Sequence, residues 1–139
     1  MPVHFFNESS DFYLADPMAA ESWLEKVCQE ENQNLGELSV VFCDDEYLLK
    51  INQDYLQHDF YTDIITFDYS DKDSISGDLF LSIERIAENA KNHDTNFQHE
   101  LHRVMVHGLL HLLGYQDKEE EDQLIMRNKE DHYLLLRPE

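Results

Sequence analysis

The chain has 139 residues, 42% of them apolar, which suits one domain with a hydrophobic core and excludes a disordered chain. Its 30 acidic and 10 basic residues give a formal charge of −20, which repels nucleic acid over long range, so RNA binding would need a local basic patch or a metal ion. No apolar run reaches the roughly 18 residues needed to span a bilayer, and the first residues lack a signal-peptide pattern, so we expect a cytoplasmic protein without membrane contact.

In the first half of the chain the pattern predicts a strand, a helix, a second strand and a second helix. Asp16 followed by Pro17 is typical of a helix start, because the aspartate caps the first turn and proline fits the first helical position. We expect Gly36 to end that helix. The other elements expected here are strands at residues 3–6 and 37–42 and a helix capped by Asp44.

The second half predicts two more strands and then three helices. A polar loop joins the expected strands at residues 62–67 and 77–82. The helices are expected from Ser82 to about residue 93, from a Thr95/Gln98 capping box onward, and from about residue 118 to 136. This order, βαβαββααα, indicates an α+β fold in a single domain over residues 1–139, with a small mixed sheet of about four strands and about five helices.

The stretch VMVHGLLHLLGYQD at residues 104–117 predicts a metal site. Residues four apart in a helix share one face, so His107 and His111 can present both rings to one point. Gly114 can take the left-handed conformation that ends a helix, and the chain could then return Asp117 toward the rings. Two nitrogens and one oxygen with an open fourth position are typical of a catalytic zinc site.

Two details of this stretch leave alternatives open. Gly108, which lies beside the histidines, leaves room for something close to the helix. Asp117 has a second interpretation as the N-cap of the last helix, with Glu120 completing a capping box, and its two oxygens could serve both roles.

Two further side chains are candidates for proton transfer. Glu100 lies seven residues before His107 and so shares its helix face, although it could instead be an exposed acid favoured by the helix dipole. His58 lies in the polar segment HDFYTD before a strand, where a capped turn with a hydrated surface is the alternative.

The motifs together resemble one family. HGLLHLLGYQD resembles the HGxLHLxGYDH signature of the YbeY family of metal-dependent bacterial endoribonucleases. Tyr55, Asp59 and the segments TDIITF (62–67) and GDLFLS (77–82) follow the family's LNxxYRxxDxPTDVLSF and GDIxIS blocks in order and spacing. The expected elements fit that fold along nearly the whole chain.

The resemblance implies a metal held by His107, His111 and the residue at position 117. Zinc fits such ligands, and nickel and cobalt fit as well. It also implies hydrolysis of single-stranded RNA in ribosomal RNA maturation and ribosome quality control, with ribosomal RNA and the small ribosomal subunit or its proteins as partners.

The sequence departs from the family at three positions. The third metal ligand, usually histidine, is Asp117, an arginine considered important for activity is replaced by Leu56, and a proline by Tyr61. A phosphate-facing cation is therefore missing at position 56, and His58 is a candidate substitute.

Two other functions are alternatives. The spacing His-x3-His-x2-Gly-x2-Asp occurs in metallopeptidases, but these place a glutamate directly after the first histidine, where this chain has Gly108. A ribosome-assembly factor with a mainly structural metal also fits, because a protein partner with a basic surface suits the charge of −20.

Overall fold

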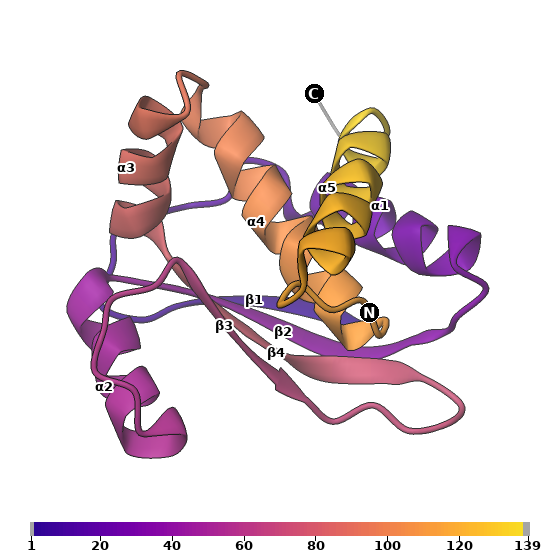
Figure 1. The fold of residues 1–139 in the computed structure, drawn as a ribbon, viewed down its shortest axis with the longest axis horizontal. Coiled ribbons are helices and arrows are strands. Elements are labelled where there is room, and N and C mark those ends of the chain that lie inside the picture. The colour runs from indigo at the N-terminus through magenta and orange to yellow at the C-terminus, as the bar shows by residue number, and fades with distance from the viewer. Residues whose placement is uncertain (1, 138–139) are drawn as a thin grey trace.

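The computed structural model describes residues 2–137, in which a four-stranded sheet packs with five helices (Figure 1). This confirms the predicted α+β fold and element order. The elements are β1 (Val3–Asn7), α1 (Pro17–Glu30), β2 (Leu35–Cys43), α2 (Asp45–Leu56), β3 (Ile64–Asp68), β4 (Ile75–Ser82), α3 (Ile83–Asn92), α4 (Phe97–Leu112) and α5 (Glu120–Leu134). Within residues 2–137, none of these helices combines the length and the apolar character that crossing a membrane requires.

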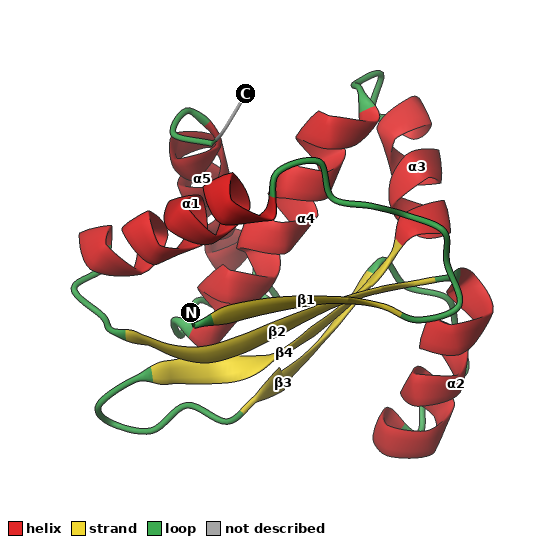
Figure 2. Cartoon of the chain, turned by 180° about the vertical axis from the view of Figure 1, so that it is seen from behind, coloured by secondary structure: helices red, strands yellow, loops and turns green. Residues whose placement is uncertain are grey.

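The sheet is mixed, with strand order β1-β2-β4-β3. Strands β1, β2 and β4 run parallel; α1 connects β1 to β2, and α2 with β3 connects β2 to β4. Strand β3 is antiparallel to β4 as the first arm of a hairpin. Figures 1 and 2 show α1, α3, α4 and α5 on one side of the sheet and α2 on the other. The sheet therefore separates a large core from a small one around Leu48 and Ile65.

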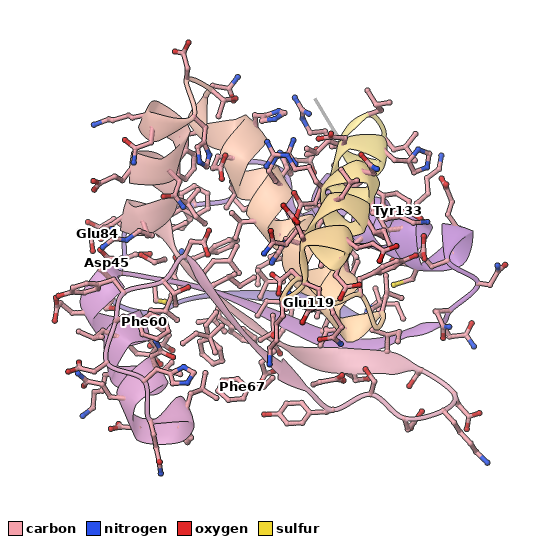
Figure 3. The ribbon with its side chains drawn as sticks, viewed as in Figure 1. Asp45, Phe60, Phe67, Glu84, Glu119 and Tyr133 are labelled. Carbon is pink, nitrogen blue, oxygen red and sulfur yellow. The ribbon has the colours of Figure 1, made fainter. Side chains whose placement is uncertain are left out.

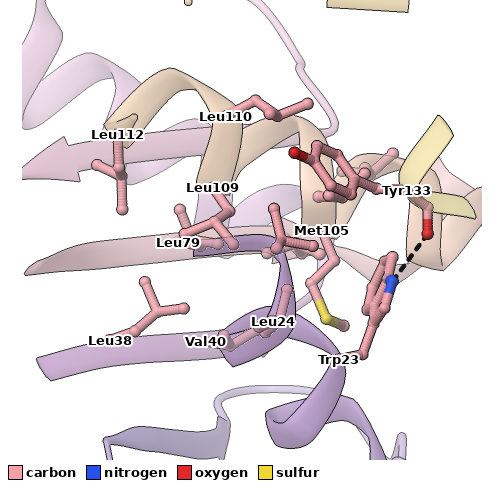
Figure 4. Packing of buried hydrophobic residues seen from close by; sticks show 14 of the residues in the cluster. Trp23, Leu24, Leu38, Val40, Leu79, Met105, Leu109, Leu110, Leu112 and Tyr133 are labelled. Carbon is pink, nitrogen blue, oxygen red and sulfur yellow. Dashed lines mark hydrogen bonds between the residues drawn. The ribbon is translucent and has the colours of Figure 1, made fainter. Parts of the chain in front are cut away.

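The large core lies between the sheet and helices α1, α4 and α5 (Figure 4). Leu38 and Leu79 rise from the central strands to meet Leu109 of α4, and all three are fully buried. The indole nitrogen of Trp23 donates a hydrogen bond to the backbone oxygen of Tyr133 over 2.9 Å, which ties α1 to α5 (Figure 4). Helix α4 is thus held between the sheet and the other helices.

Gly108 brings α4 close to the sheet. A Cβ atom at this position would lie 2.6 Å from Cδ1 of Ile64 on β3 and 2.9 Å from Cδ2 of Leu79 on β4. The room that we expected Gly108 to leave close to the helix is filled by these sheet side chains. The glycine therefore serves the packing of α4 on the sheet.

Two helix ends differ from the sequence-based prediction. Helix α1 ends at Glu30, where Asn32 takes φ 60° and the amide of Gln33 donates to the oxygen of Cys28; Gly36, expected to end the helix, lies inside β2. Asn96, and not Thr95, caps α4 by accepting from the amide of His99 over 2.8 Å. The amide of Thr95 instead closes the turn after α3.

Candidate metal centre

Helix α4 places two histidine rings against each other. His107 and His111 lie one turn apart on the same face, with ring centroids 4.5 Å apart and planes nearly perpendicular. Their Nε2 atoms are 3.0 Å apart. Both rings are partly buried.

The chain turns back directly after α4. Gly114 takes φ +107°, as predicted, and its amide donates to the oxygen of His111 while the amide of Tyr115 donates to the oxygen of Leu110. These two bonds form a Schellman motif, for which a glycine in the left-handed region is the usual residue. The reversal brings Asp117 back to the histidine rings.

Asp117 completes a set of three donor atoms. Its Oδ2 lies 3.3 Å from Nε2 of His107 and 3.2 Å from Nε2 of His111. With the 3.0 Å between the two nitrogens, these distances form a nearly equilateral triangle. Ligands bound about 2.0–2.1 Å from a tetrahedral zinc ion lie about 3.3–3.4 Å apart, so the triangle matches one face of such a site. We call His107, His111 and Asp117 the ligand cluster.

The hydrogen bonds of the two Nδ1 atoms, on the outer side of each ring, determine where the Nε2 lone pairs point. Nδ1 of His107 lies 2.6 Å from Oε2 of Glu130, and Nδ1 of His111 lies 2.9 Å from the backbone oxygen of Tyr115. Carboxylates and carbonyls only accept, so each Nδ1 carries a proton and each neutral ring presents a bare Nε2. When both rings are neutral, two nitrogen lone pairs and the carboxylate of Asp117 therefore converge without a donor hydrogen, which is the chemistry that a cation requires.

Glu130 is held in place by a partly buried ion pair with Arg103. Arg103 donates to Oε1 of Glu130 over 2.7 Å and to Asp131 over 2.6 Å, while Oε2 of Glu130 faces His107. Burial alone lowers the pKa of His107, but the hydrogen bond and charge of Glu130, with the charge of Asp117, raise it above its ordinary value. A proton and a metal ion thus compete for the same nitrogen.

The helix that follows begins later than expected. The N-cap of α5 is Glu119, whose side chain makes no capping hydrogen bond, so the predicted capping box of Asp117 and Glu120 is wrong. The reason is that the turn after α4 directs the Asp117 carboxylate toward the histidines, two residues before the helix starts.

Glu100 lies outside the ligand cluster. It is buried, which rules out the exposed alternative, and its carboxylate lies 3.3 Å from Nδ1 of His93. Within residues 2–137 it makes no hydrogen bond or ion pair to the cluster. Burial raises the pKa of nearby Asp63, and the negative charge of Glu100 adds to this effect.

His58 lies on the segment between α2 and β3. Its ring is exposed and stacks on Phe60 with centroids 5.2 Å apart. Figure 3 shows Phe60 beside α2, well away from Glu119 at the start of α5. Leu56 is 39% exposed at the end of α2, and the hydroxyl of Tyr61 donates to Glu46.

The sequence prediction missed Glu130 and Arg103, the residues that orient His107. One signal was available, because Glu130 falls between Met126 and Tyr133 at spacings of four and three residues on the buried face of α5. A carboxylate on such a face needs a partner.

A cavity of about 290 Å³ borders the ligand cluster. It is lined by His107, Asp117, Gln123, Met126, Arg127 and Glu130. A larger cavity of about 710 Å³, lined by His102 and Arg137 among others, shares no residue with the cluster. The smaller cavity therefore offers a substrate a route to the ligand cluster.

Comparison with known proteins gives a consistent result over the whole chain. The family model described as Endoribonuclease YbeY matches residues 5–136. A Flavobacterium psychrophilum protein named Endoribonuclease YbeY is 50% identical over 131 residues, 94% of each chain. A Parabacteroides distasonis protein of the same name is 40% identical over 139 residues, covering 100% of this chain and 98% of the relative. The solution structure of TM1509 from Thermotoga maritima shares the fold, with a TM-score of 0.66 and 24% identity over 95% of this chain and 86% of that one.

Proposed function

Because the chain belongs to the YbeY endoribonuclease family, we propose that it is a metal-dependent endoribonuclease. It cleaves single-stranded RNA in the cytoplasm, as a single domain, during ribosomal RNA maturation and ribosome quality control. Its partners are ribosomal RNA and the small ribosomal subunit or its proteins.

One observation carries the metal dependence. Nε2 of His107, Nε2 of His111 and Oδ2 of Asp117 converge within 4.8 Å, and the outer nitrogens of both rings already bind acceptors. In the proposal these three residues hold one divalent ion, with zinc as the first candidate and nickel or cobalt fitting the same donors. When bound, the ion supplies a Lewis acid for a phosphate oxygen.

The protein's own groups orient the ligands and limit access to them. Glu130 fixes the ring of His107, and the carbonyl of Tyr115 fixes the ring of His111. His58 and Glu100 are the proposed groups for proton transfer. Replacing the group that moves the proton should remove one limb of the pH–rate profile. The variants His58→Ala and Glu100→Gln test the two candidates.

Peptide hydrolysis is disfavoured by the packing of α4. Metallopeptidases with this histidine spacing need a glutamate at position 108. Here that position is Gly108, which offers no general base, and a Cβ atom on it would already lie 2.6 Å from Cδ1 of Ile64.

The test is RNA cleavage by the metal-loaded protein, with His111→Ala and a chelated sample as controls. Cleavage of single-stranded RNA that both controls lose is the expected result. A folded, fully loaded protein that cleaves no RNA would contradict the nuclease proposal and favour an assembly factor whose acidic surface binds a basic ribosomal protein.

A further inference from the structure

An RNA-cleaving protein with a charge of −20 needs a cation where the phosphate sits. Four of its ten basic side chains are already used in ion pairs within residues 2–137. These are Lys50 with Asp54, Arg85 with Asp45, Arg103 with Glu130 and Asp131, and Lys129 with Glu31. Arg103, although close to the ligand cluster, is thus neutralised by two carboxylates.

Arg127 differs from these four basic residues in its position at the cavity and in having no ion pair within the described residues. It lines the 290 Å³ cavity together with His107 and Asp117, so a ligand that fills this cavity lies beside both Arg127 and the ligand cluster. Its side chain is exposed and makes no ion pair in the described part of the chain. Gln123, one helical turn earlier on α5, lines the same cavity and adds an amide.

Within the cavity, an anion is favoured only next to Arg127, away from the two lining carboxylates. Glu130 is compensated by Arg103 and hydrogen-bonded to His107, and Asp117 belongs to the ligand cluster. Arg127 is therefore the lysine or arginine of this lining, and it forms no ion pair with a carboxylate of the described residues. A guanidinium presents a planar fork of N–H donors that matches two oxygens of a phosphate group.

We infer that Arg127 binds a phosphate of single-stranded RNA beside the ligand cluster. This inference rests on the proposed nuclease function for the identity of the ligand. It assigns Arg127 a role in substrate binding, with the metal ligands and their affinity left unchanged.

The experiment measures binding of a short, fluorescein-labelled 2′-O-methyl oligouridylate to metal-loaded protein over a series of salt concentrations. Arg127→Ala should weaken binding about 10- to 100-fold, the value of a charge-assisted hydrogen-bond pair. It should also reduce the slope of log K against log salt by about 0.7, the contribution of one phosphate contact on a single strand. Arg127→Lys should keep the slope but lose part of the affinity, because the charge stays and the fork is lost.

The matched control is Lys72→Ala, which removes the same charge from the exposed loop between β3 and β4. It should change binding less than about twofold. Equal effects of Lys72→Ala and Arg127→Ala would overturn the inference, because general charge would explain both. A loss of metal affinity in Arg127→Ala would also overturn it.

RNA cleavage by the wild-type protein separates this inference from the proposed function. If the wild type cleaves RNA and Arg127→Ala binds as well as wild type, the function stands and the inference is wrong. If the wild type does not cleave but binds the oligonucleotide through Arg127, the inference stands and the nuclease proposal fails.

Discussion

Glu130 determines which nitrogen of His107 faces the other two ligands. Its Oε2 accepts from Nδ1 over 2.6 Å, and its other oxygen is held by Arg103. Glu130→Gln keeps the shape but removes the charge, so metal affinity should fall about 10-fold or more. Competition with a chromogenic chelator measures this. Glu119→Gln, the same change at an exposed position before α5, should leave the affinity unchanged.

Asp117 sets the net charge of the ligand cluster. Asp117→His replaces a carboxylate by a neutral ring and raises the charge of the loaded site by one. A more positive site favours the deprotonated form of any acid beside it, so the pH optimum of cleavage should shift downward. An unchanged pH–rate profile together with unchanged metal affinity would remove Asp117 from the ligands.

For single residues, the sequence predicted that His107, His111 and Asp117 come together, and it missed the groups that orient His107. The spacing of His107 and His111 and the turn at Gly114 are local, so helix geometry is enough to bring Asp117 close. Glu130 reaches His107 across 23 residues. That contact depends on how α5 packs on α4, which helix periodicity does not determine.

Gly108 controls the distance between α4 and the sheet. In Gly108→Ala the new methyl group would meet Cδ1 of Ile64 at 2.6 Å. Overpacking costs about 1–3 kcal/mol, and the better helix propensity of alanine offsets roughly 1 kcal/mol, which leaves a net loss of up to about 2 kcal/mol. Urea denaturation should therefore give a lower free energy of unfolding.

A second substitution tests the cause of that loss. Ile64→Val removes the clashing Cδ1 atom, so it should restore part of the stability of Gly108→Ala while destabilising the wild type. Strictly additive effects would show that the contact between these two residues is not responsible.

Glu31 joins α1 to the carboxyl-terminal part of the fold. It accepts from Tyr115 over 2.6 Å, from Lys129 over 3.0 Å and from Tyr133. Burial would raise the pKa of Glu31, but these hydrogen bonds and the charge of Lys129 lower it below the ordinary 4.5. The folded state therefore favours the ionised form, and this stability is complete above pH 4.5 and is lost as the pH falls through the lowered pKa.

Glu31→Gln should consequently be less stable than wild type at neutral pH, by about 1–2 kcal/mol, and the difference should shrink in acid. Urea denaturation of chelated protein at several pH values measures this without a contribution from metal. The control Glu30→Gln alters a pair with His132 in which both side chains are more than one-third exposed, and it should have little effect. A gap between Glu31→Gln and wild type that stays constant with pH would contradict the assignment.

The elements were more predictable than their ends. Apolar periodicity and the caps at Asp16 and Ser82 identified the helices correctly, because both signals are local. The start of α4 differed from the prediction because two neighbouring residues could both cap the same helix. Thr95 and Asn96 are both capping residues, and the choice followed from the turn that closes α3.

For the molecule as a whole, the core and the ligand cluster are separate structures. The buried residues of the large core come from the sheet and α1, α3, α4 and α5, and none of them is a ligand. Removing the metal should therefore leave a folded protein. Metal at about 100 times its dissociation constant adds about 2.7 kcal/mol, so chelation should lower the melting temperature by roughly 8–10 °C.

Circular dichroism with and without chelator tests this prediction. The chelated protein should keep its helical signal and unfold cooperatively on heating. Unfolding at room temperature on chelation would contradict the prediction and indicate a structural metal, as in the assembly-factor alternative.

The order of the strands is the part of the fold that the sequence did not predict. Strand β4 lies between β2 and β3, which places it beside a strand more than 30 residues earlier as well as its hairpin partner. Such pairing depends on contacts distant in sequence, whereas alternation within each strand is local.

The positions of the ligand cluster along the chain have a consequence for protein synthesis. All four strands precede residue 83, whereas His107, Asp117 and Glu130 follow it. Translation therefore delivers the sheet first, and a nascent chain that has emerged only through α4 holds both histidines without Asp117 or the carboxylate that orients His107. The proposed nuclease centre is completed only after most of the chain has left the ribosome, whose own RNA is the proposed substrate.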